Sequence, residues 1–180
     1  MEKYIFKSER LGFRYWKDSD LKPFADMTAD AEIMKYYPKI LTFAESGNLI
    51  EKIKQHFDIN GFGLHAVDIL ESNKFIGYIG FMKPSFESFF TPCTEIGWRL
   101  SKEEWNNGFA TEGAERCLEF GFKELGFSEI YSFTSTVNKA SERVMQKIGM
   151  QKIGEFDHPN LDNKSQLKRH VLYVIRGTYE

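Results

Sequence analysis

The segment between residues 94 and 150 constrains the fold most, because two strand patterns and two helix patterns alternate within it. Residues 94–100 alternate between two faces, which is the period of a half-buried strand. The more apolar face carries Thr94, Ile96, Trp98 and Leu100. The other face carries Glu95, Gly97 and Arg99, so the Glu95 carboxyl points away from the more apolar face.

A turn with little side-chain bulk follows this strand. Residues 101–105 break the alternation, and Gly108 and Ala110 then leave the main chain accessible. A helix that begins near Thr111 points its free N–H groups and the positive end of its dipole toward this turn, which suits a phosphate or pyrophosphate. Helical spacing continues through Ala114, Leu118, Gly121, Phe122 and Leu125. Gly126 stands at the position of a C-terminal cap.

A second strand and a second helix complete the segment. Residues 129–137 mix Ile, Tyr, Phe, Thr and Val, a composition typical of a strand. Asn138 can cap the next helix, which ends at Gly149. The apolar stripe of this helix consists of Ala140, Val144, Met145 and Ile148.

Each candidate functional group in this segment also has a simpler structural interpretation. A Gly-bearing turn can merely reverse the chain, and Asn138 can serve only as a helix cap. Ser141 fits the first turn of a helix, and Glu95 fits a solvated strand carboxylate. The functional interpretation is favoured because all four features occur in one order and at one spacing.

This arrangement resembles the GNAT superfamily of acetyl-CoA-dependent N-acetyltransferases, and within it the RimJ/RimL-like branch, which is named for acetylation of ribosomal-protein N-termini. The resemblance is carried by residues 95–100 (EIGWRL), 105–112 (WNNGFATE), 138–141 (NKAS) and 147–150 (KIGM), and it extends more loosely from 9–11 to 169–173. It implies a mixed α/β fold over residues 1–180 as a single domain. In that fold a mostly antiparallel seven-stranded sheet is splayed between its fourth and fifth strands and carries helices on both faces.

The resemblance also implies a binding site for acetyl-CoA. Backbone amides of residues 105–111 would hold the CoA pyrophosphate, strand residues 98–100 would pair with the pantetheine arm, and Asn138 and Ser141 would face the arm near the sulfur. The implied cofactor-binding residues are Trp98, Arg99, Leu100, Asn106, Asn107, Gly108, Phe109, Ala110, Thr111, Asn138 and Ser141. The family usually has Gly where Asn106 stands. Because Asn tolerates positive φ, we expect weakened rather than abolished binding.

Acyl transfer to an amine requires a neutral nitrogen. An α-amine with a pKa of about 8 is roughly one-tenth neutral at pH 7, whereas a lysine side chain with a pKa of about 10.4 is almost entirely charged. Glu95 is the best candidate for the general base, acting through a water. A backbone N–H of the same strand would stabilise the oxyanion, and Ser141 is the candidate proton donor to the leaving thiolate. Direct transfer needs no covalent enzyme intermediate, which fits the lack of an evident Cys/His or Ser/His pair.

The rest of the chain supplies the other elements and the candidate acceptor contacts. The patterns predict strands over 11–16, 62–69, 75–82, 150–156 and 169–176, and helices over 18–30 and 44–59. In the resembled family the two-helix region covers the acceptor, so Tyr36 and Tyr37 are candidate acceptor contacts or packing residues. His158 and His170 flank the loop that lies by the acceptor in the resembled branch. Otherwise each of the four His is expected at the surface or at a cap.

Composition and charge exclude several classes of protein. The formal net charge of −2 over 180 residues argues against electrostatic binding to nucleic acid. The His residues show no HxxxH or HxH spacing, so we expect no metal site. Cys93 and Cys117 fit free thiols in a reducing compartment, and Cys93 as a nucleophile lacks an evident His partner. No signal peptide or apolar run of about 18 residues is evident, so we expect a cytoplasmic protein.

Several alternatives stay open at this point. The acceptor is a protein or peptide N-terminal amine or a small-molecule amine, and the resemblance favours the peptide. A rival interpretation is a catalytically idle acyl-CoA-binding sensor or subunit. A nucleotide-binding protein that uses the same turn is disfavoured because no Walker Lys follows Gly108. A monomer and a homodimer are both compatible with the sequence.

Overall fold

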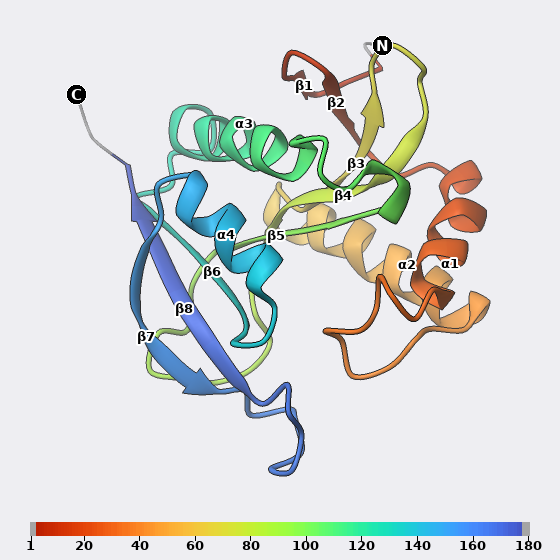
Figure 1. The fold of residues 1–180 in the computed structure, drawn as a ribbon. Helices are drawn as coiled ribbons and strands as arrows, with labels where there is room; N and C mark the ends of the chain where they lie inside the picture. The colour runs from red at the N-terminus through yellow and green to blue at the C-terminus, as the bar shows by residue number, and fades with distance from the viewer. Residues whose placement is uncertain (1–2, 178–180) are drawn as a thin grey trace.

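The computed structural model describes residues 3–177, which form an open eight-stranded sheet with helices on both faces (Figure 1). The strands are β1 (Phe6–Lys7), β2 (Leu11–Arg14), β3 (Leu64–Ile69), β4 (Phe75–Met82), β5 (Glu95–Leu100), β6 (Glu129–Ser135), β7 (Gln151–Asp157) and β8 (Arg169–Arg176). Their order across the sheet is β1-β2-β3-β4-β5-β6-β8-β7. β5 and β6 are parallel, and the other neighbouring pairs are antiparallel. The predicted mixed α/β class with a mostly antiparallel sheet is confirmed.

The sheet opens between β5 and β6. These strands share one register pair, Glu95 with Tyr131. Next to it the Ser132 hydroxyl donates to the carbonyl oxygen of Ile96 (3.0 Å), which ties the strands together just before they separate. β5 and β6 are the fourth and fifth of the seven expected strands, so the predicted position of the splay is confirmed.

The expected number of strands is wrong by one. The additional strand is β1, in which Phe6 is the register partner of Phe13 and Lys7 that of Gly12. A two-residue strand is too short to show a period-2 pattern, so only its pairing with β2 reveals it. This strand lies at the sheet edge farthest in pairing order from the splay and leaves its geometry unchanged.

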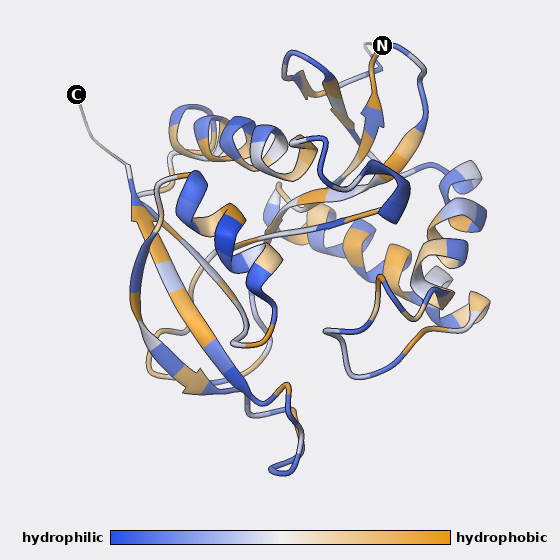
Figure 2. Ribbon diagram, in the orientation of Figure 1, coloured by the Kyte–Doolittle hydropathy of each residue, from blue (hydrophilic) through white to orange (hydrophobic). Residues whose placement is uncertain are grey.

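Two helices pack on each face of the sheet. α1 (Leu21–Ala29) and α2 (Phe43–Asn60) cover one face, and α3 (Phe109–Lys123) and α4 (Lys139–Lys147) cover the other (Figure 1). On the α2 face, Ile53 and Phe57 pack with Tyr78 of β4. On the α3 face, Leu118 packs in a core with Ile96 of β5. The apolar stretches run along the central strands and one side of each long helix (Figure 2), as burial of one helix face requires.

α1 begins later than the helix predicted over residues 18–30, because a buried ion-pair network holds the residues before it. Arg14 Nη1 lies 2.7 Å from Asp20 Oδ2, and Arg14 Nη2 lies 2.6 Å from Asp68 Oδ1. Asp20 also accepts a hydrogen bond from Lys17 N (2.9 Å). These contacts hold residues 18–20 in a short 3-10 turn, so the α-helix begins only at Leu21.

The other helix ends follow local cap chemistry. α2 has a reciprocal capping box between Thr42 and Glu45 and a C-cap at Gly61, where φ is 76°. It therefore spans Phe43–Asn60, one residue beyond each end of the predicted 44–59. α3 begins at Phe109, two residues before the predicted Thr111. No helix within residues 3–177 is both long and apolar enough to span a membrane.

Candidate active site

Two cavities adjoin where β5 and β6 separate. The first, which we call the Glu95 cavity, has a volume of about 450 Å³, and the second, the turn cavity, has a volume of about 440 Å³. Both are lined by Tyr36, Tyr37, Trp98, Asn138 and Ser141. Because the cavities share these walls, one elongated ligand can occupy both.

The turn cavity is built around the N-terminus of α3. Gly108 is the N-cap with φ of 81°, and Asn106 has φ of 62°, so both lie in the left-handed region that Gly and Asn tolerate best. Gly108 offers no side-chain acceptor, and the bond from Glu112 N to Gly108 O (3.0 Å) is the first that enters the helix. The N–H groups of residues 109–111 precede that bond and form the positive end of the helix dipole. The turn therefore fits a pyrophosphate.

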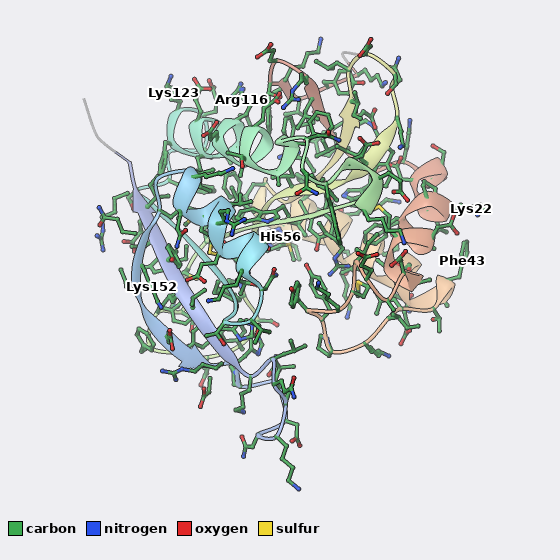
Figure 3. The ribbon with its side chains drawn as sticks, viewed as in Figure 1. Lys22, Phe43, His56, Arg116, Lys123 and Lys152 are labelled. Atoms are coloured by element: carbon green, nitrogen blue, oxygen red, sulfur yellow. The ribbon has the colours of Figure 1, made fainter. Side chains whose placement is uncertain are left out.

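The turn cavity also collects positive charge. Its charged lining residues are Lys35, Arg99, Arg143, Lys147, Glu32 and Glu104. Arg143 and Lys147 are four residues apart on α4 and share one helix face. The sequence-based prediction missed both, although this spacing on the helix that Asn138 caps is the signal that could have identified them. By contrast, Lys22 and Lys123 project from the periphery of the molecule (Figure 3).

The free edge of β5 faces the gap. The carbonyl of Ile96 points toward β6, where it accepts the Ser132 bond. Since alternate residues of a strand direct their backbone groups to the same side, those of Trp98 and Leu100 also face the gap, and those of Arg99 face β4. Trp105 Nε1 donates to the Leu100 carbonyl (3.0 Å). The N–H and C=O of Trp98 and the N–H of Leu100 are thus directed toward a ligand in the gap.

Glu95 lines its cavity at the last pairing position of β5 and β6. Burial raises the pKa of this carboxyl from its ordinary value to about 8. Gly97 follows on the same face of the strand, and a Cβ there would lie 4.0 Å from Glu95 Oε1. Without that side chain the carboxyl is open to the cavity. A pKa near neutrality suits a general base that operates at neutral to slightly alkaline pH.

Asn138 and Ser141 form a hydrogen-bonded pair at the start of α4. Asn138 Oδ1 accepts from Ser141 N (3.3 Å), which leaves Asn138 Nδ2 to donate to Thr134 Oγ1 (2.9 Å) and to Ser141 Oγ (3.1 Å). Because an amide NH₂ only donates, the Ser141 hydroxyl is the acceptor in the last bond. Its own proton is free to donate to a group in the cavities that Ser141 lines.

The loop between α1 and α2 covers both cavities with two tyrosines. Tyr36 and Tyr37 line both, and the Tyr37 ring lies against the buried Arg99 guanidinium. Tyr78 of β4 forms part of the wall of the Glu95 cavity, where burial raises the pKa of its hydroxyl. The Tyr78 phenol is therefore a neutral hydrogen-bonding group at physiological pH.

The opposite wall of the Glu95 cavity contains His158 and His170, whose ring centres are 5.1 Å apart. Burial and the neighbouring His170 and Lys168 lower the pKa of His158 to about 4. Burial also lowers the pKa of His170. Both imidazoles are consequently uncharged at neutral pH.

The structure brings nearly all of the predicted site residues to these two cavities. Lining residues from that set are Tyr36, Tyr37, Glu95, Trp98, Arg99, Leu100, Asn106, Gly108, Phe109, Ala110, Thr111, Asn138, Ser141, His158 and His170. Asn107 is the exception, since it is exposed and lines neither cavity. Its side chain contributes nothing visible to the site, although its backbone belongs to the same turn.

Two other expectations meet different outcomes. His65 is buried, with 2% of its surface exposed, so its predicted location at the surface or at a cap is wrong. It packs edge-on against aromatic rings that include Phe6 and Phe57.

Burial, with smaller contributions from nearby carboxylates, raises the pKa of Cys93 to about 12, which makes it a poor nucleophile. Within residues 3–177 no group of three or more His, Cys, Asp or Glu is arranged to hold a metal ion.

A comparison with protein families identifies the type of domain. A family model described as an acetyltransferase (GNAT) domain matches residues 10–151. The chain belongs to the GNAT acetyltransferase family. As a GNAT protein it is an acetyltransferase that takes its acetyl group from acetyl-CoA.

Relatives of this GNAT protein agree with the assignment. An uncharacterized N-acetyltransferase, YnaD, from Bacillus subtilis is 31% identical over 150 residues, which are 83% of this chain and 84% of YnaD. The crystal structure of a GNAT-family acetyltransferase from Bacillus anthracis is 29% identical with a TM-score of 0.79, covering 94% of this chain and 96% of that one. Spermidine N-acetyltransferase from Vibrio cholerae, in complex with CoA and spermine, shares the fold at 19% identity, with a TM-score of 0.73 and coverage of 93% and 95%.

Proposed function

We propose that this GNAT acetyltransferase transfers the acetyl group directly from acetyl-CoA to a primary amine, with Glu95 as the general base. The observation that carries the proposal is the exposure of the Glu95 carboxyl, with a pKa of about 8, to a cavity that adjoins the turn cavity. The acceptor amine belongs to a protein or peptide N-terminus, as the RimJ/RimL-like motifs favour, or to a small molecule.

The charges and backbone groups of the cleft support one orientation of acetyl-CoA. The pyrophosphate rests on the backbone N–H groups of residues 109–111, with Arg143 and Lys147 nearby. The pantetheine arm runs along the free edge of β5, where its amides pair with the Trp98 C=O and the Leu100 N–H. The thioester then lies where the two cavities meet.

Each proton in the transfer has a proposed carrier. The amine nitrogen attacks the thioester carbonyl carbon, and its proton passes to the Glu95 carboxylate. The oxyanion that forms is stabilised by the Trp98 N–H, a fixed donor on the strand edge. When the tetrahedral intermediate collapses, the C–S bond breaks and Ser141 donates its free hydroxyl proton to the thiolate, while the proton held by Glu95 returns through solvent water to restore the Ser141 hydroxyl. A thiol has a pKa of about 8.5, so this last step contributes less than the base does.

Release of free thiol from acetyl-CoA, measured with a panel of amines, tests the proposal. The panel contains a short peptide with a free N-terminus, a simple alkylamine, an arylalkylamine and a polyamine. Amine-dependent thiol release, with the N-acetyl product identified by mass, is the expected result. Stabilisation of the fold by acetyl-CoA without thiol release from any amine would contradict it and favour a protein that only binds the cofactor.

A further inference from the structure

The Glu95 cavity has an aromatic lining to which seven rings contribute. They are Tyr36, Tyr37, Tyr78, Trp98, Phe133, His158 and His170. Among these, Phe133 of β6, His158 and His170 form one wall, with ring centres 5.1 to 6.3 Å apart. We call these three residues the ring wall. The three ring planes are tilted by 47 to 59° to one another, so the wall is an uneven but uncharged and polarisable surface.

The ring wall is held in place from behind. Phe86 lies 4.6 Å from the His158 ring, and Phe156 lies 5.5 Å from the His170 ring. His158 Nδ1 accepts from Asn160 N (3.3 Å), so the neutral ring carries its proton on Nε2. Because packing and a backbone hydrogen bond hold the rings, the wall is a preformed aromatic surface against which another ring can pack.

The cavity has little charge to offer an acceptor. Glu95 carries the one carboxyl group among its lining residues, and those residues include no Lys, Arg or Asp. The two histidines are neutral at physiological pH, because burial lowers the pKa of each. If the acceptor carried a second or third ammonium group, that group would lose its water on entering the cavity. No second carboxylate lines the cavity to offset this desolvation cost.

The spacing between Glu95 and the ring wall fits a short linker. Phe133 is two residues beyond Tyr131, the register partner of Glu95. At about 3.3 Å per residue along β6 and about 4.8 Å between neighbouring strands, the main chains at Glu95 and Phe133 are about 8 Å apart, a gap that the two side chains narrow. An amine that reaches Glu95 can therefore carry a ring on a linker of two or three bonds and place that ring on the wall.

We propose that the acceptor has a single basic amine joined by a short linker to an uncharged aromatic ring, with the amine at Glu95 and the ring on Phe133, His158 and His170. This inference rests on the proposed function and narrows it. Both a free arylalkylamine and a peptide that begins with an aromatic residue have this chemistry. Polyamines and other polycations do not.

The test compares kcat/KM for 2-phenylethylamine, pentylamine and spermidine, measured by thiol release from acetyl-CoA. Pentylamine has a chain of similar reach without a ring, and spermidine adds charge instead of a ring. We expect 2-phenylethylamine to exceed both by at least about tenfold. A peptide that begins with phenylalanine is measured alongside, and the better of it and 2-phenylethylamine identifies the source of the ring.

A variant tests the wall itself. Phe133→Leu removes the ring but keeps apolar bulk, and we expect it to lower the ratio of kcat/KM for 2-phenylethylamine to that for pentylamine by about fivefold. Because both amines are measured on the same preparation, partial unfolding cancels in the ratio. Phe89→Leu is the matched control, since Phe89 is 75% exposed and lies outside the cavity lining.

The possible outcomes distinguish a failure of the aromatic-acceptor inference from a failure of the proposed acetyl transfer. If spermidine or pentylamine is acetylated as efficiently as 2-phenylethylamine, the aromatic acceptor is wrong and acetyl transfer to amines stands. An unchanged ratio in Phe133→Leu would also overturn the inference. If no amine releases thiol although acetyl-CoA stabilises the protein, the proposed function fails, and the inference fails with it.

Discussion

The guanidinium carbon of Arg99 lies 3.8 Å from the centre of the Tyr37 ring. Arg99 is only 8% exposed, and its guanidinium carbon also lies 5.4 Å from the centre of the Tyr78 ring. Arg99 belongs to β5, whereas Tyr37 belongs to the loop that covers both cavities. This contact therefore ties the cover of the cleft to the strand that carries Glu95. Its cation–π energy at such a desolvated site is about 2 kcal/mol.

Removal of the Tyr37 ring should loosen the cover of the cleft. We expect Tyr37→Ala to raise KM for both acetyl-CoA and the amine by roughly tenfold, because the loop loses its anchor on Arg99. Tyr37→Phe keeps the ring and should stay within about twofold of the wild type. Steady-state kinetics with each substrate varied in turn distinguish the two variants. Equal KM values for Tyr37→Ala and the wild type would show that the stacking does not position the loop.

The turn before α3 should be intolerant of a side chain that carries negative charge. Gly108→Glu adds a side chain at φ of 81° and brings a carboxylate to the proposed pyrophosphate site, so the Kd for acetyl-CoA should rise at least about tenfold, or about 1.4 kcal/mol. Gly126→Glu is the matched control. Gly126 has φ of 69° with nothing within 4 Å of an added Cβ, and it lines neither cavity. If calorimetric titration finds equal affinity for acetyl-CoA in both variants, the pyrophosphate does not bind at the Gly108 turn.

The cations of α4 should contribute to CoA affinity in a salt-dependent way. Arg143→Ala and Lys147→Ala each remove a positive charge from the turn cavity, and each should weaken acetyl-CoA binding by about threefold to tenfold at low ionic strength. The difference from the wild type should shrink as salt is added. Lys22→Ala is the control, because Lys22 is exposed on α1. An effect that is equal in all three variants would contradict the assignment.

The free energy of unfolding should depend on pH in a way that reflects the raised pKa of the buried Glu95 carboxyl. The carboxyl has a pKa of about 8 in the folded protein and an ordinary value near 4.5 when unfolded, so the folded state binds more protons between these limits. The free energy of unfolding should therefore fall as pH rises toward 8. His158 acts in the opposite direction below about pH 6.5, because its pKa is lowered on folding. Urea denaturation of the wild type and of Glu95→Gln between pH 6.5 and 8.5 isolates the Glu95 effect as the difference between the two proteins, because the shifted His and Cys groups contribute equally to both.

The sequence predicts the region around Glu95 well because the signals there are local. Alternation fixes which residues of β5 share a face, and Asn138 with Gly149 delimits α4. The position of the splay and the expected cavity-lining residues are implied by the resemblance to the GNAT superfamily, which these local motifs carry. What the sequence does not contain is distance between remote segments. Arg99 and Tyr37 stack although they are far apart in the chain, and no periodic pattern in the sequence predicts that contact.

Other features escaped prediction for related reasons. His65 is a polar residue in an aromatic environment, and the burial of its neighbours on β3 becomes apparent only when the sheet is assembled. Arg143 and Lys147 look like ordinary solvated helix charges until α4 is placed beside the turn. The two-residue β1 exists only through its pairing with β2. In each case tertiary packing, rather than local propensity, determines the outcome.

The most direct test of the proposed mechanism is the pH dependence of kcat for the wild type and Glu95→Gln. For the wild type, kcat should rise with pH and level off above about 8, as the Glu95 carboxyl loses its proton. Glu95→Gln should lower kcat by about 10² to 10⁴ and lose this inflection, while the affinity for acetyl-CoA is kept. Glu71→Gln, an exposed residue in the turn between β3 and β4, is the control and should behave as the wild type. A Glu95→Gln variant with wild-type kcat and the same inflection would contradict the role of Glu95.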